Sequence, residues 1–169
     1  MNILFALVLI FFAAFSRLIP HAPNFTPVIS IALFAGAYLH KKFAFFVPIA
    51  AMLVSDLVVG FYNPASMAFV YGSLLLTVAL GLTMKNRISI MKVGGLSLAG
   101  AVLFFALTNF GVWIVPNSMY PRTFAGLVEC FVMAIPFFGN TIFSVLIYSG
   151  AMFGVYEVAE RFVFKTQGA

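Results

Sequence analysis

Long apolar runs separated by short polar loops make up almost the whole chain. Five of these runs cover residues 2–19, 27–39, 43–60, 66–84 and 93–115, and a longer apolar stretch covers residues 123–158. A helix needs about 20 apolar residues to cross a hydrocarbon core of about 30 Å. The pattern therefore predicts an all-α integral membrane protein with six transmembrane helices, in which residues 1–169 form a single transmembrane domain.

The last apolar stretch has two interpretations. As one helix it would be about 54 Å long, which exceeds the thickness of the bilayer core. Pro136 and Gly139 interrupt it, and proline removes a backbone hydrogen bond and clashes with the preceding turn. One interpretation is two full spans joined by a tight turn at residues 138–140. We favour the other, an additional short helix at residues 123–135 that lines or re-enters the outer side before the last span, because it keeps the basic residues on one side.

Basic residues follow every second apolar run. They are Lys41, Lys42, Lys85, Arg87, Lys92, Arg161 and Lys165, whereas the intervening gaps carry only Arg17 and Arg122. By the positive-inside rule this alternation places both termini in the cytoplasm. We expect a multi-pass protein of the bacterial inner (cytoplasmic) membrane. A cleaved signal peptide is the alternative for the N-terminus, but no basic residue precedes the apolar run and residues 13–16 make a poor cleavage site.

Composition excludes several classes of protein. Hydrophobic residues are 64% of the chain, the mean hydropathy is +1.14 and 22 residues are phenylalanine, so the bilayer must act as solvent. The net charge of +5 lies in loops beside the spans and does not indicate nucleic acid. One cysteine and two histidines are too few for a closed metal site. Motifs for hydrolysis or phosphate binding are missing, so we expect no enzyme, catalytic residue, metal or cofactor.

The remaining polar side chains gather at the external ends of the expected spans. The candidate substrate-binding residues are Asp56, Asn109, Trp113, Arg122 and Glu129, with Arg17, His21 and Asn24 gating or bracing them. Carboxylates at membrane depth are costly on the lipid face, so Asp56 and Glu129 should face the interior and have partners. A pocket open to the external side would bring these groups together. Simpler structural roles are also open: Asp56 pairs with Arg17, Asn109 bonds another helix, and Trp113 anchors the interface.

Several stretches carry a resemblance to known proteins. They are Arg17 to Val28, Leu33 to Leu39, Ser55 to Leu57, Thr108 to Trp113 and Ala134 to Asn140. These stretches resemble a group of small bacterial membrane proteins classed as transport proteins with no established substrate. More distantly, Thr26-Pro27-Val28 and the run that follows are similar to the S components of energy-coupling factor (ECF) vitamin transporters. The first span departs from that family because it lacks the Ala-x-x-x-Ala pair with which S components dock their coupling subunit.

The resemblance implies an S-component-like bundle that captures a small solute, a vitamin or related micronutrient, from the external side for uptake. Its implied partners are the small-molecule substrate, the lipid bilayer and a separate ATP-driven coupling module. The alternative is a non-transport membrane scaffold similar to the small integral-membrane subunit of a cell-wall elongation complex. A scaffold would not need Asp56 and Glu129 directed at a common cavity.

Overall fold

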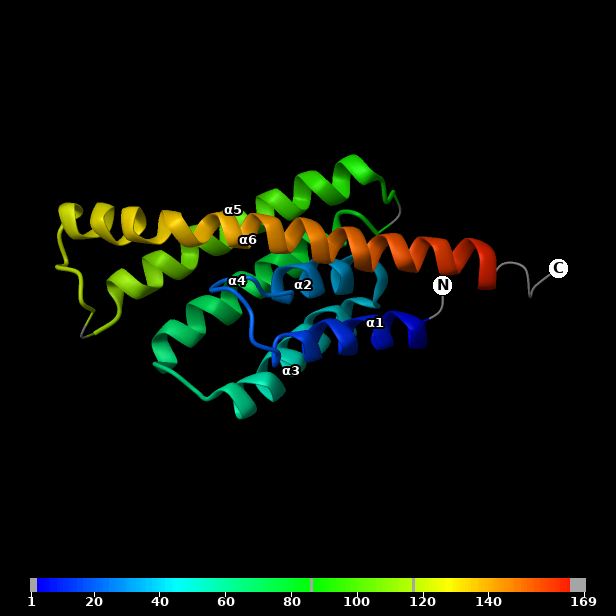
Figure 1. Ribbon diagram of the computed structural model, residues 1–169, viewed down its shortest axis with the longest axis horizontal. Coiled ribbons are helices and arrows are strands. Elements are labelled where there is room, and N and C mark those ends of the chain that lie inside the picture. Colours follow the sequence, from blue (N-terminus) through cyan, green and yellow to red (C-terminus); the bar gives the residue numbers. More distant parts are fainter. Residues whose placement is uncertain (1–2, 86, 117, 165–169) are drawn as a thin grey trace.

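The computed structural model describes residues 3–85, 87–116 and 118–164 as a bundle of helices (Figure 1). In chain order they are α1 (Ile3–Ser16), α2 (Val28–Tyr38), α3 (Lys41–Val59), α4 (Pro64–Leu82), α5 (Ile90–Ile114) and α6 (Phe124–Ala159), and α6 continues into a π-helical turn, η1 (Glu160–Phe164). The expected all-α class is confirmed.

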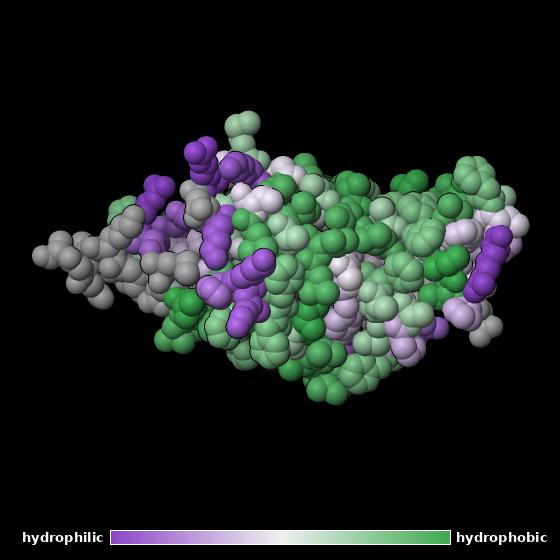
Figure 2. Space-filling view, turned by 180° about the vertical axis from the view of Figure 1, so that it is seen from behind, coloured by the Kyte–Doolittle hydropathy of each residue, from purple (hydrophilic) through white to green (hydrophobic). Residues whose placement is uncertain are grey.

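Successive long helices run in alternating directions along the bundle (Figure 1). The start of α1, the α2–α3 and α4–α5 connections and the end of α6 consequently share one end of the molecule. We call this the basic end, because it carries Lys41, Lys42, Lys85, Arg87, Lys92 and Arg161. Figure 2 shows hydrophilic residues gathered there, at the left of that view, beside a broad hydrophobic belt. The expected grouping of these basic residues is confirmed.

Four of the described helices, α3 to α6, are long and apolar enough to cross a membrane. The two others are shorter: α1 has 14 residues and α2 has 11. At ~1.5 Å per residue an α2-sized helix is about 16 Å long, roughly half of a hydrocarbon core. The structure thus indicates a membrane protein with six helices, of which four have the length of a full span.

The helix α2 is the centre of the bundle. All of its residues from Val28 to Tyr38 are buried, and it packs against each of the other five α-helices. A helix that is hydrophobic all round is suited to full enclosure. Its polar residue Ser30 is satisfied by α6, because its hydroxyl donates to the carbonyl of Val145 at 3.1 Å and accepts from Ser149 at 3.0 Å.

Two glycines allow α2 and α4 to touch at backbone distance. A Cβ built on Gly36 would lie 2.8 Å from the Cα of Gly81 and would collide with the carbonyl oxygen of Val78. A Cβ on Gly81 would lie 3.0 Å from the Cα of Gly36. Small residues at such crossings are how membrane helices approach closely. Gly36 and Gly81 are therefore the residues that set the distance between α2 and α4.

The additional short helix before the last span is a wrong prediction. Residues Phe124–Ala159 form one helix that passes through Pro136 without a break, and Figure 1 shows it along the full length of the bundle. The same tolerance is seen at Pro48 inside α3. Proline removes a single backbone bond, and packing against neighbouring helices offsets that loss in membrane helices. Because α6 packs on α5, α2 and α1, its neighbours hold it together on both sides of Pro136.

Candidate functional site

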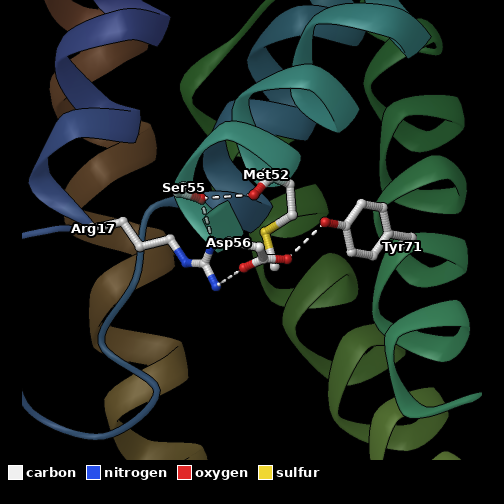
Figure 3. A network of polar contacts seen from close by, with 5 residues as sticks. All are labelled: Arg17, Met52, Ser55, Asp56 and Tyr71. Carbon is white, nitrogen blue, oxygen red and sulfur yellow. Dashed lines mark hydrogen bonds and ion pairs between the residues drawn. The ribbon is translucent and has the colours of Figure 1, made fainter. Parts of the chain in front are cut away.

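A buried ion pair joins α1 and α3 (Figure 3). Arg17 follows the last turn of α1, and its Nη2 lies 2.7 Å from Oδ1 of Asp56 in the last turn of α3. Asp56 is 0% exposed. A carboxylate near a helix C-terminus faces the negative end of the helix dipole, and burial makes its charge costlier still. Asp56 therefore needs partners that offset the cost of burying it.

The network extends to α4 and to the neighbouring serine. The Tyr71 hydroxyl donates to Oδ2 of Asp56 at 2.6 Å, and Nη1 of Arg17 donates to the Ser55 hydroxyl. The Ser55 hydroxyl in turn donates to the carbonyl of Met52 at 2.8 Å. Oδ1 of Asp56 has Arg17 as its partner, and Oδ2 has Tyr71, so each carboxylate oxygen meets one side chain from another part of the bundle.

The charges of this network also affect the pKa of Tyr62 in the α3–α4 loop. Partial burial raises the pKa of Tyr62 above its usual value, and the negative charge of Asp56 raises it further, while Arg17 opposes the shift. A nearby charge shifts a pKa only over short distances, so the side chain of Tyr62 lies close to Asp56 and Arg17. It lies where the loop leaves the bundle and is 41% exposed.

The cavity beside Arg17 and Ser55 is small. Its volume is about 10 Å³, and it is also lined by Met52 and Val28. A space of this size holds about one water molecule. The described conformation is therefore closed around the ion pair.

The other predicted residues of the pocket lie on α5, α6 and the loop between them. Asn109 is half-buried and donates from its side chain to the carbonyl of Phe105 in its own helix at 2.7 Å. The Trp113 indole donates to the carbonyl of Pro121 at 2.9 Å. Arg122 and Glu129 are exposed.

The structure brings together two of the predicted site residues, Arg17 and Asp56. In the described chain, α3 packs against α1, α2 and α4, whereas α5 packs against α2, α4 and α6. Asp56 and Asn109 are therefore carried by helices that are not neighbours. A single cavity shared by the predicted residues stays a prediction.

The loop after α1 is tied to the middle of α6. Asn140 donates to the carbonyl of Pro23 at 3.0 Å, and Ser144 donates to the carbonyl of Thr26 at 3.2 Å. Within this loop His21 and Asn24 are both exposed, and Asn24 has a positive φ of 61°, a backbone conformation that asparagine adopts more readily than most residues. Nδ1 of His21 lies 2.6 Å from the carbonyl oxygen of Ile19.

The sequence analysis did not identify two tyrosines whose hydroxyls donate hydrogen bonds to carboxylates. Tyr71 bonds Asp56, and Tyr38 donates to Oε1 of Glu157 at 2.6 Å, linking α2 to α6 near the basic end. A tyrosine within an apolar helix was the available signal, because a buried hydroxyl usually finds a partner. The sequence does not show which carboxylate each tyrosine meets, since that depends on how the helices pack.

Comparison with curated proteins and with solved structures finds no match. A family model does match, over residues 1–166, and its description is a family of unknown function, DUF6580. The match covers nearly the whole chain. The chain is a member of the DUF6580 family.

Proposed function

We propose that the protein is a membrane transport protein that captures a small solute from the external side, with the Arg17–Asp56–Tyr71 network as part of its binding site. The observation that carries the proposal is the fully buried Asp56, a carboxylate enclosed by the bundle and held by Arg17 and Tyr71. Ionisable groups inside membrane segments are costly and commonly mark ligand or ion pathways. If this ion pair only stabilised the fold, well-packed apolar side chains could stabilise it equally well.

Binding would open the closed network. A solute that donates a hydrogen bond to Oδ1 of Asp56, or offers a carboxylate to Arg17, would replace part of the ion pair. Arg17 is the movable partner, because it follows the end of α1 while Asp56 sits within α3. The cavity of about 10 Å³ would then enlarge toward Tyr62 and the external loops.

The finer form of the proposal is an S-component-like protein for a vitamin or related micronutrient, working with an ATP-driven coupling module. A six-helix bundle of 169 residues suits such a subunit. Trp113, Arg122, Glu129 and Asn109 would supply further contacts from α5 and α6 when the bundle rearranges, with His21 and Asn24 in the loop above it.

The experiment is a thermal-stability screen of the purified protein in detergent against a set of vitamins and amino-acid-like solutes. A true ligand should raise the melting temperature of the wild type and of the control Lys42→Gln, whose charge lies at the basic end. The increase should vanish in Asp56→Asn at equal folded yield. A ligand that stabilises Asp56→Asn as strongly as the wild type would remove Asp56 from the site.

A further inference from the structure

A second cavity, far larger than the first, lies at the basic end between the start of α5 and the end of α6. Its volume is about 570 Å³, within the range of about 300–1,000 Å³ typical of sites for small molecules. Gly94, Ser97, Gly150, Gly154, Glu157 and Arg161 are among its lining residues. Figure 1 shows the cause: α5 and α6 cross near their middles and diverge toward the basic end.

Glycines keep this cleft open. A Cβ built on Gly94, Gly150 or Gly154 meets no atom within 4 Å, so these positions face empty space rather than a neighbouring helix. The rim is apolar and exposed, with Ile90 at 93% and Phe162 at 74%. An apolar rim on a membrane helix faces lipid, so the cleft opens sideways into the bilayer as well as toward the basic end.

The floor of the cleft carries a hydroxyl that lacks a partner. Ser97 is 0% exposed, and its Oγ forms no hydrogen bond within the described residues. Its polar neighbours are already engaged: Ser149 donates to Ser30, and Glu157 accepts from Tyr38. A buried hydroxyl without a partner is destabilising. Ser97 lines the cleft, so a small movement of its side chain would offer this donor to whatever fills the cleft.

The exposed charge at the mouth is basic, because Glu157, the carboxylate among the lining residues, is half-buried and accepts a hydrogen bond from Tyr38. Arg161 is exposed at the rim, and Arg87, Lys85 and Lys92 belong to the same end of the molecule. Basic residues at the cytoplasmic membrane surface attract anionic lipid headgroups. An occupant that suits the whole cleft has an anionic head for Arg161, an acceptor oxygen for Ser97 and a hydrocarbon tail for the glycine-lined walls.

We infer that this cleft binds an anionic phospholipid. The phosphate lies by Arg161, an ester carbonyl accepts from Ser97, and one acyl chain fills the space over Gly150 and Gly154. A transmembrane helix of a partner protein suits the site less well, because the carbonyls of a helix are already bonded internally. The site is independent of the Arg17–Asp56–Tyr71 network.

The test measures binding of phosphatidylglycerol to the delipidated, detergent-purified full chain by native mass spectrometry and by thermal stabilisation. Gly150→Leu places a side chain in the space of the acyl chain and should weaken binding about tenfold or more, as loss of a few methylene contacts implies. Ser97→Ala and Arg161→Gln should each weaken it by about threefold to tenfold. The control is Gly72→Leu, at another glycine with open space around it but on α4.

Four outcomes would overturn the inference. Gly150→Leu and Gly72→Leu could bind phosphatidylglycerol equally, which would place the lipid elsewhere. Inorganic phosphate alone could stabilise the wild type as much as the lipid, which would reveal a site for a free anion. Phosphatidylcholine could bind as tightly as phosphatidylglycerol, which would remove the role of the basic end. A polypeptide that co-purifies with wild type and is lost in Gly150→Leu would identify a partner helix instead.

Discussion

At the scale of single residues, the ion pair of Arg17 and Asp56 places a fully buried carboxylate inside the bundle. Its two charges come from different helices and meet a third helix through Tyr71. The two charges compensate each other only while both side chains are present, because either charge alone would lack a counter-ion inside the bundle.

This balance predicts a non-additive mutant cycle. Arg17→Gln leaves the Asp56 carboxylate buried and should lower the free energy of unfolding by about 3–5 kcal/mol. The double variant Arg17→Gln with Asp56→Asn removes both charges, so it should recover at least half of that loss. Chemical unfolding in a mild detergent measures both. Additive losses would show that the two side chains do not interact in the folded protein.

The raised pKa of Tyr62 predicts that the stability of the protein depends on pH. The folded pKa of Tyr62 lies above the value in the unfolded chain, so the folded protein holds the phenolic proton more tightly. The free energy of unfolding should therefore fall as pH rises through and beyond about 10, where the unfolded phenol ionises. The slope of unfolding free energy against pH should shrink in Tyr62→Phe. An unchanged slope would show that Tyr62 ionises equally in both states.

At the scale of elements, the apolar pattern predicts the helices well. The first five apolar runs correspond to the helices α1 to α5 in order, although α1 and α2 are shorter than a full span, and Asp56 lies within the last turn of α3. The sequence misleads at Pro136, because the local cost of proline is visible in the sequence while the packing that offsets it along α6 is not. One partner of Asp56 can be predicted from the sequence, and the other depends on packing. Arg17 was foreseeable as a nearby cation, whereas Tyr71 depends on how α4 is rotated.

The continuous α6 predicts a long distance between two of its exposed residues. Spin labels at Val128 and Ile147, which lie on opposite sides of Pro136 and are 45% and 57% exposed, should be separated by about 28 Å at a rise of ~1.5 Å per residue. Pulsed electron paramagnetic resonance measures this distance. A hairpin or re-entrant arrangement would bring the labels much closer. The same two spin labels in a Pro136→Ala variant should be separated by nearly the same distance.

The crossing of α2 and α4 predicts intolerance of a single methyl group. Gly36→Ala and Gly81→Ala each force a Cβ against the backbone of the other helix, so each should cost about 1–3 kcal/mol of stability. Gly72→Ala is the matched control, because a Cβ there meets nothing within 4 Å. Melting temperatures in detergent provide the comparison. Equal melting temperatures for Gly36→Ala and Gly72→Ala would refute the close contact.

At the scale of the whole molecule, charge is distributed unequally between the two ends. The basic end carries most of the lysines and arginines, and the opposite end carries Arg122 and the loop before α6. The positive-inside rule predicts from this asymmetry that the basic end faces the cytoplasm, and the consequences below hold for that orientation. External solutes would reach the Arg17–Asp56–Tyr71 network, and the lipid cleft would lie in the inner leaflet.

The orientation is testable with two exposed methionines. On a Cys130→Ala background, Met119→Cys should react with a membrane-impermeant thiol reagent in intact cells, and Met91→Cys should react only after the cells are opened. Both side chains are more than four-fifths exposed, at 84% and 88%, so access and not burial decides the labelling. The reverse pattern would invert the topology and, with it, the side from which solute is captured.

The enclosure of α2 bears on how the chain is assembled during synthesis. This helix is too short to cross the bilayer and packs against α4, α5 and α6, which are made after it. Ser30 and Tyr38 find their hydrogen-bonding partners on α6, which is made after α2, α3, α4 and α5. Insertion therefore cannot finish helix by helix in order. The burial of α2 requires α4, α5 and α6 to be in place, so α6 completes the enclosure of α2.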